Sequence, residues 1–256
     1  MRILITNDDG ILAPGIEALY QSIRNLGEVE VVAPETAQSA MGHAITVRAP
    51  MAVHRIHVNN VFYGWSVDGR PADCVKLAMV ELLKQRPDFV LSGINAGCNT
   101  GINVLYSGTV AGAVEAAFFG VPSMAISLEL SDEMDFHAAG RIARAVFQSY
   151  AESRPIAGTC LNVNIPALDR GLPRGVRCCP QSTVPMDDHY RSEVDERNRR
   201  LYWLDGRMPE EHSTNTDLAV MRGGYVAVTP LRFDMTDHAA LARASNFTWP
   251  TSFSGT

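Results

Sequence analysis

Short apolar runs alternate with amphipathic segments from the N-terminus to about residue 170. The first run, residues 2–6 (RILIT), is apolar and β-branched and leads into Asn, Asp and Gly, which is typical of a buried strand ending in a turn. Apolar residues then recur at spacings of three and four from residue 16 to residue 26, before Gly27, which predicts a helix. A second run at 29–33 completes a β-loop-α-β unit, for which we expect a right-handed crossover and parallel strands.

The same rhythm continues along the chain. We expect further strands at 44–47, 51–58, 61–67, 89–93, 123–128 and 160–166, and helices at 71–83, 109–120 and 136–150. Alternation of apolar and polar residues in 52–58 indicates an antiparallel ribbon with one solvated face. The whole pattern predicts an α/β fold that is Rossmann-like and doubly wound, with a mostly parallel sheet.

The rhythm is lost after residue 170. Gly, Pro, Arg and Asp dominate the next thirty or so residues, followed by an isolated strand signal at 201–204, a returning strand at 224–231 and a short helix at 236–244 capped by Thr236. We therefore expect a Rossmann-like catalytic core over residues 1–170. A C-terminal β-rich extension should follow over 171–256, with an extended arm or hairpin at about 180–216.

Composition and charge narrow the possible partners. Of the 256 residues 46% are hydrophobic and 20% are charged, as in ordinary globular proteins, and the net charge of −6 offers no general attraction to nucleic acid or anionic membranes. The five cysteines form neither an even disulfide framework nor a C-x-x-C pattern, and there is no signal peptide or long apolar segment. We expect a cytoplasmic protein whose partners include neither polymeric nucleic acid nor a membrane.

Polar side chains follow three of the expected strands. Asp8 and Asp9 come directly after the first strand, Ser39 lies in the loop after the second, and Asn95 follows the strand at 89–93. In doubly wound sheets ligands bind at the carboxyl ends of the strands. Adjacent carboxylates repel each other unless they share a proton or a cation, and oxygen ligands suit Mg²⁺ or Mn²⁺. The alternative is a helix cap beside a turn residue, but the position at a strand end favours a metal site.

An anion site is predicted near the third strand end. The Gly- and Asn-rich stretch that contains Asn99 allows close approach of backbone to a ligand, and Ser107, Gly108 and Thr109 then open a helix. Hydroxyls and free N–H groups at a helix N-terminus attract phosphate, although Ser and Thr there often serve only as caps. Together with paired aspartates, this arrangement is what phosphoryl chemistry requires.

Several segments together resemble the SurE family of nucleotidases: MRILITNDDGILAPGIEAL, the loop that contains Ser39, GRPADCV, SGINAGCNTGINVLYSGTV and TDLAVMRGGYVAVTPL. The resemblance implies an enzyme that removes phosphate from nucleoside 5′- and 3′-monophosphates, with polyphosphate hydrolysis in certain members. It also implies metal ligands at the positions of Asp8, Asp9, Ser39 and Asn95, and dimers or tetramers that exchange C-terminal segments. This chain departs from the family pattern at Arg70, where Thr is common, and at Ala116, where Gly is common.

The resulting hypothesis is a phosphatase with one divalent cation, Mg²⁺ or Mn²⁺, in each subunit. Asp8, Asp9, Ser39 and Asn95 hold the metal, Ser107, Gly108, Thr109 and Asn99 bind the phosphate, and metal-activated water attacks with Asp8 and Asp9 as the catalytic residues. A covalent aspartate route stays open, although the missing D-x-D spacing favours direct water attack.

Two other functions fit parts of the pattern. A phospho-receiver domain also carries paired acidic residues after its first strand, but it needs an acceptor Asp at the end of its third strand and a late Lys. Here that strand leads to Asn95, and the only lysines are Lys76 and Lys84. A catalytically silent nucleotide-binding module would bind nucleotide without releasing phosphate.

Overall fold

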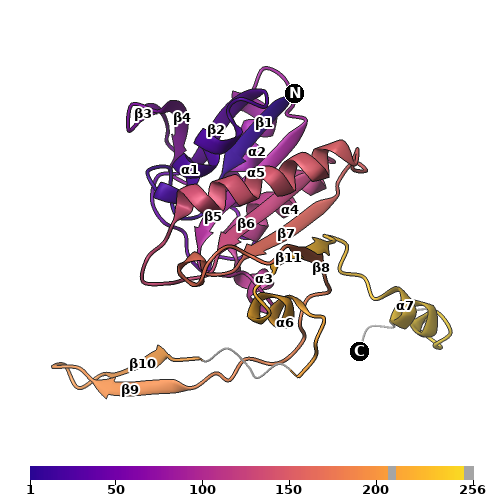
Figure 1. Ribbon diagram of the computed structural model, residues 1–256. Helices are drawn as coiled ribbons and strands as arrows, with labels where there is room; N and C mark the ends of the chain where they lie inside the picture. The colour runs from indigo at the N-terminus through magenta and orange to yellow at the C-terminus, as the bar shows by residue number, and fades with distance from the viewer. Residues whose placement is uncertain (207–211, 251–256) are drawn as a thin grey trace.

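The protein is described by a computed structural model that covers residues 1–206 and 212–250. A nine-stranded sheet forms its centre, with helices on both faces, as Figure 1 shows. The strands of this sheet, in spatial order, are β3 (Val53–Val58), β4 (Phe62–Val67), β2 (Glu28–Pro34), β1 (Arg2–Thr6), β5 (Phe89–Ala96), β6 (Ser123–Leu128), β7 (Cys160–Ile165), β11 (Val226–Leu231) and β8 (Val176–Cys178). A separate two-stranded hairpin consists of β9 (Tyr190–Val194) and β10 (Arg200–Leu204).

The six strands from β4 to β7 run parallel, as the β-α rhythm predicted. The strands outside these six run in the opposite direction: β3 is antiparallel to β4, β11 is antiparallel to β7, and the edge strand β8 is parallel to β11. The helices are α1 (Pro14–Ile23), α2 (Pro71–Leu77), α3 (Asn103–Tyr106), α4 (Gly108–Phe118), α5 (Phe136–Glu152), α6 (Asp217–Arg222) and α7 (His238–Ala244), with a π-helical turn at Ala78–Leu82 and a 3₁₀ turn at Leu168–Arg170.

Successive side chains of β1 pack into the apolar cores on opposite faces of the sheet. Ile3 and Ile5 pack into the apolar cluster that includes α1 and α5, whereas Leu4 packs into the cluster that includes α2. Because successive side chains of a strand point to opposite faces, a strand covered on both sides must be apolar throughout. The predicted α/β, doubly wound fold with a mostly parallel sheet is therefore confirmed.

The order of the strands reverses at β1. The chain passes from β1 to β2 on one side of β1, and later returns to place β5 on its other side, followed outward by β6 and β7. Such a reversal leaves a crevice at the carboxyl ends of the two central strands, because the connections leave them in opposite directions. The candidate site lies at this end of β1 and β5.

Several local predictions need correction. Residues 44–47 are irregular instead of forming a strand, since the backbone N–H of Thr46 donates to the Asp73 side chain at 2.8 Å. Helix α3 lies in a stretch that was expected to be a loop, and β5 runs on to Ala96. Asp237 caps α7 in place of Thr236, because it directly precedes the first helical residue and its carboxylate accepts from Ala240 N at 2.8 Å.

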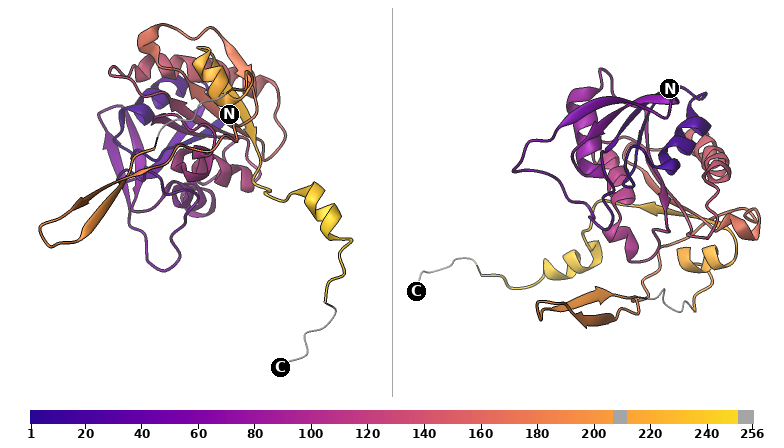
Figure 2. Two further views of the ribbon diagram at one scale, coloured as in Figure 1. Left: turned by 90° about the horizontal axis from the view of Figure 1, so that it is seen from below. Right: turned by 90° about the vertical axis from the view of Figure 1, so that its left-hand side faces the viewer.

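The segment after residue 170 contributes to the main sheet and also leaves it. Strands β8 and β11 extend the sheet beside β7, so the sheet continues across the expected boundary at residue 170. The β9–β10 hairpin lies within the expected arm and projects from the body, as does α7 (Figures 1 and 2). Residues 207–211 of that arm lie outside the described residues. Within the described residues no helix is long and apolar enough to cross a membrane.

Candidate metal and phosphate site

Asp8 lies at the end of β1 against the start of α4. Its side chain is buried, at 5% exposure, and Oδ1 accepts a hydrogen bond of 2.5 Å from Thr109 Oγ1. A Cβ at Gly108 would come within 2.7 Å of Asp8 Cβ, so the first turn of α4 approaches this closely only with glycine there. The aspartate and the helix N-terminus are thus in direct contact.

Asp9 lies on the side of β5. The backbone N–H of Ala96 donates to Asp9 Oδ2 at 3.1 Å, and Asn95, the preceding residue, donates from Nδ2 to the carbonyl of Gly97 at 2.7 Å. That bond uses the nitrogen of the Asn95 amide and leaves its Oδ1 lone pairs for another partner. Because β1 and β5 are parallel neighbours, their polar ends lie side by side.

The loop after β2 folds over the turn that contains the aspartates. The N–H of Gln38 donates to the backbone carbonyl of Asp8 at 2.7 Å, and the exposed Ser39 follows directly. Gly10, with φ of +98°, lies against the backbone of Thr36 in the same loop. Backbone bonds therefore bring the Ser39 segment to the acidic pair.

The two hydroxyl side chains at the start of α4 both form hydrogen bonds within the protein. Ser107 is the N-cap, and its Oγ accepts from Val110 N at 3.1 Å, while the Thr109 hydroxyl donates to Asp8. The capping alternative weighed for Ser107 is therefore correct for its side chain. Anion binding at this end would depend on the backbone N–H groups of the first turn, which a helix leaves without intrahelical partners.

Asn99 forms hydrogen bonds with residues of β6 and β7. It is buried, and its Nδ2 donates to Ser127 Oγ at 2.9 Å while its backbone N–H donates to Asn164 Oδ1 at 2.8 Å. The side chain is thus tied to the ends of β6 and β7. Its expected contact with phosphate stays a prediction.

Sequence reasoning missed Asp217, which organises the glycine-rich loop from the C-terminal side. This aspartate is fully buried and accepts backbone hydrogen bonds from Gly101, Ser182 and Leu218, each at 2.8 Å. It stands directly after Thr216, the N-cap of α6. The signal available in the sequence was a charged residue, Asp217, directly before the apolar residues of α6.

Both aspartates of the pair hold their protons unusually tightly. Burial raises the pKa of Asp8 to about 6, the neighbouring Asp9 charge adds to this, and the Thr109 hydroxyl opposes it. Burial also raises the pKa of Asp9, against the hydrogen bond from Ala96. Two partly desolvated carboxylates side by side are therefore unfavourable when both are ionised and no cation is bound.

The donor set fits a hard divalent cation. Two carboxylates, the free oxygen of Asn95 and the hydroxyl of Ser39 are all oxygen ligands, which Mg²⁺ and Mn²⁺ prefer. Over the described ranges, no group of three or more His, Cys, Asp or Glu side chains could hold a metal, so the ligands of a structural zinc site are missing there. A metal at this site would complete its coordination with water and substrate oxygens.

The raised pKa of Asp8 predicts how the metal-free protein responds to pH. Between about pH 4 and pH 6 the folded protein keeps a proton that the unfolded chain, with the ordinary pKa of 3.8, releases. Raising the pH through this window should therefore lower the free energy of unfolding, by about 3 kcal/mol at most. Urea unfolding in EDTA across the window measures the slope. Asp8→Asn should remove this contribution, and an unchanged slope in that variant would refute the assignment.

The strand reversal at β1 and the polar groups that meet there define a Rossmann-like α/β protein with a candidate ligand site at the carboxyl ends of β1 and β5. The sequence model described as Survival protein SurE matches residues 3–188. The chain belongs to the SurE family.

Known relatives resemble this chain over almost its full length. The 5'-nucleotidase SurE of Rhodopirellula baltica is 46% identical over 92% of this chain and 94% of its own length. The 5'-nucleotidase SurE 1 of Thermus thermophilus is 45% identical over 96% of this chain and 97% of its own. The crystal structure of the SurE protein from Aquifex aeolicus superposes with a TM-score of 0.81 at 35% identity, covering 95% of this chain and 98% of that one.

Proposed function

We propose that this protein is a phosphoric monoester hydrolase, a divalent-metal-dependent nucleotidase that releases phosphate from nucleoside 5′- and 3′-monophosphates. The relatives named 5'-nucleotidase SurE support the reaction. The observation that carries the proposal is the hydrogen bond from Thr109 to Asp8, which joins the acidic pair to the N-terminus of α4. A phosphate could therefore contact a metal and the positive end of a helix at once.

Each residue of the site has a distinct task in this proposal. Asp8, Asp9, Ser39 and Asn95 hold one Mg²⁺ or Mn²⁺ ion, which would supply positive charge to the phosphoryl oxygens and lower the pKa of a water molecule. Thr109 keeps Asp8 oriented, and the N–H groups at the start of α4 bind the phosphate. We assign to Asp9, which is only half-buried, the task of orienting the attacking water. This assignment corresponds to direct attack of water.

A cavity beside the phosphate seat offers room for the rest of the substrate. Its volume is about 1030 Å³, and its walls include Ser107 together with apolar side chains such as Val104, Leu105 and Val110. Clefts of this size and character are typical of small-molecule sites. The cavity supports a nucleoside as the leaving group, and chains of polyphosphate remain a second candidate substrate.

Exposed apolar side chains on the projecting parts support a homo-oligomer, a dimer or a tetramer. Tyr202, Trp203 and Leu204 on the hairpin, and Leu241 and Phe247 on or next to α7, are each more than half exposed. Clustered exposed apolar residues of this kind usually mark association surfaces. Light scattering after gel filtration would give the mass, and a monomer at micromolar concentration would contradict this part. We assign the enzyme to the cytoplasm.

Phosphate release tests the proposed reaction. The purified protein is incubated with a panel of nucleoside 5′- and 3′-monophosphates, an aryl phosphate and short polyphosphate, with Mg²⁺, with Mn²⁺ or with EDTA. We expect release that requires metal and is fastest for a nucleotide, because the cavity would add binding contacts to the nucleoside. Nucleotide binding without phosphate release under any metal would instead identify a silent binding module.

A further inference from the structure

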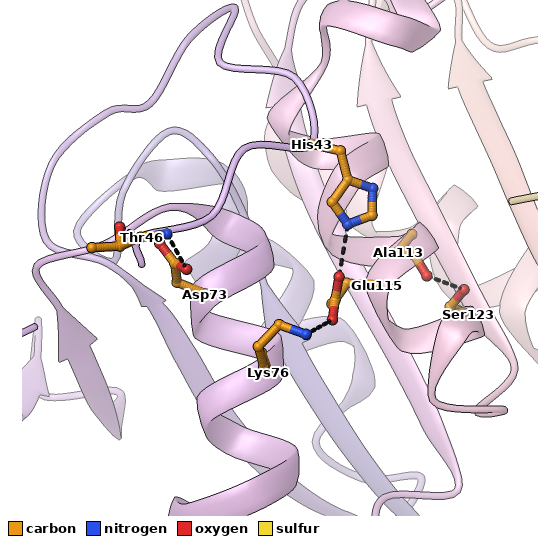
Figure 3. A network of polar contacts seen from close by, with 7 residues as sticks. All are labelled: His43, Thr46, Asp73, Lys76, Ala113, Glu115 and Ser123. Carbon is orange, nitrogen blue, oxygen red and sulfur yellow. Dashed lines mark hydrogen bonds and ion pairs between the residues drawn. The ribbon is translucent and has the colours of Figure 1, made fainter. Parts of the chain in front are cut away.

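A buried carboxylate joins three segments in the wall of the cavity proposed above for the nucleoside. The Glu115 side chain on α4 is 6% exposed, and it lies between His43 Nε2 at 2.7 Å and Lys76 Nζ at 2.6 Å. Figure 3 shows the imidazole and the ammonium reaching the two oxygens of Glu115 from different elements, the irregular loop after β2 and helix α2. No step of the proposed reaction uses any of the three.

The three groups form a polar cluster that favours the ionised form of Glu115. Burial raises the pKa of Glu115, but the hydrogen bonds and charges of His43 and Lys76 outweigh it and hold that pKa below its ordinary value. Glu115 is therefore ionised at neutral pH, and both of its oxygens are in use. Hydrogen bonds to an ionised acceptor are about twice as strong as neutral ones.

The loop that His43 belongs to has little structure of its own. Residues 35–46 form neither helix nor strand and are mostly exposed, and the backbone has positive φ at Ala40 and Gly42, 56° and 55°. Its attachments to the body include Gln38 N to Asp8 O, Gly42 N to Tyr106 O, His43 to Glu115 and Thr46 to Asp73. Ser39 stands between the first two of these attachments, and His43 directly follows the second.

The His43 attachment differs from the backbone contacts around Ser39. It depends on a side chain, and its acceptor is a buried carboxylate that Lys76 holds in place. Glu115 also lies on the helix whose first turn contacts Asp8 through Gly108 and Thr109. One helix thus carries both a contact to the acidic pair and the attachment of the loop that faces it.

We propose that Glu115, with Lys76 behind it, is a positioning residue that holds His43 and thereby keeps Ser39 at the metal site. This inference rests on the proposed function for its choice of ligand. Without the attachment, the loop would have to be ordered when metal binds, and the free-energy cost of ordering would weaken binding. The expected defect is in metal affinity, and turnover at saturating metal should change little.

The test compares His43→Ala with His54→Ala, which removes an exposed imidazole on edge strand β3. Free Mn²⁺ is measured by electron paramagnetic resonance, which reports binding without any reaction. We expect His43→Ala to raise the Kd for Mn²⁺ about tenfold, the effect of losing one hydrogen bond to a charged group. His54→Ala should match the parent protein, and His43→Gln, which keeps a donor for Glu115, should recover most of the affinity.

A double-mutant cycle identifies the route of the effect. If His43 acts through Ser39, then Ser39→Ala combined with His43→Ala should bind Mn²⁺ little worse than Ser39→Ala alone. Additive losses would overturn the proposal. His43, Lys76 and Glu115 all line the cavity, so a higher KM for nucleotide with unchanged Mn²⁺ affinity would overturn the proposal too and make His43 a substrate contact.

Different results would overturn the proposed function and the positioning role of Glu115. If the parent protein binds Mn²⁺ but releases no phosphate, the proposed function fails while the Mn²⁺ comparison still tests the positioning role. If the parent protein is active and His43→Ala binds Mn²⁺ normally, only the positioning role is overturned. Thermal unfolding of each variant checks that the fold is intact, as expected for a side chain that is 40% exposed.

Discussion

Asp9→Asn is expected to reduce metal-dependent phosphate release by about 100- to 1,000-fold, the usual cost of removing one essential electrostatic partner of a transition state. The change keeps the shape of the side chain, and an Asn oxygen can still accept from Ala96 N, which lies 3.1 Å from Asp9 Oδ2. What disappears is one negative charge of the metal site. The fold should therefore survive, and the stability without metal should rise because two partly buried carboxylates no longer repel each other.

Steady-state phosphate release at saturating Mn²⁺ measures this effect, with unfolding curves as the check on the fold. Asp169→Asn is a suitable control because it neutralises an exposed carboxylate in the turn after β7. Near-normal turnover of Asp9→Asn at saturating metal would refute the assigned role. Loss of Mn²⁺ binding together with activity would place Asp9 among the ligands, whereas loss of activity alone would favour orientation of the water.

Asp217→Ala is expected to cost about 3–5 kcal/mol of stability, because each buried backbone donor left without an acceptor costs about 1–3 kcal/mol. Three backbone N–H groups, those of Gly101, Ser182 and Leu218, would lose their acceptor inside the protein. Asp217→Asn keeps one acceptor oxygen and should have a smaller effect. Urea unfolding measures both, and Asp169→Ala gives the matched control for an exposed aspartate.

Asp217→Ala should also disturb the candidate metal and phosphate site, because Asp217 binds the glycine-rich loop at Gly101. Gly101 belongs to the same stretch as Asn99, whose backbone carbonyl accepts from Asn162 and Asn164 at 2.7 and 3.2 Å. We expect lower activity at temperatures where the variant is still folded. A stability within 1 kcal/mol of the parent, about the size of an ordinary surface substitution, would contradict the structural role.

Local patterns along the chain were sufficient for the central architecture. The strands at 2–6 and 123–128 have the predicted bounds, because buried parallel strands are uninterrupted apolar runs between turn residues. The helix expected at 136–150 runs from Phe136 to Glu152, with its apolar face toward the sheet. Asp8, Asp9 and Asn95 lie together for the simple reason that parallel neighbouring strands end at one edge.

Other features depend on partners that are remote in the sequence. The expected strand at 44–47 is irregular because Thr46 bonds to Asp73, a buried acceptor 27 residues away. Glu115 lies 39 positions after Lys76 and 72 positions after His43 in the sequence. Asp217 lies 116 positions after Gly101 and accepts a hydrogen bond from the backbone N–H of that glycine. Side-chain pairing over such separations leaves no periodic signal in the sequence.

The sequence by itself determined most of the order of strands and helices up to β7, apart from the strand expected at 44–47 and the missed helix α3, together with the doubly wound class and the polar residues at the strand ends. Each of these follows from short-range periodicity and turn chemistry. The tertiary structure alone decided that β8 and β11 complete the main sheet, that Thr109 and Gly108 touch Asp8, and that Glu115 holds the loop of Ser39. These features are contacts between distant segments, and their energy depends on burial and geometry that only the folded chain creates.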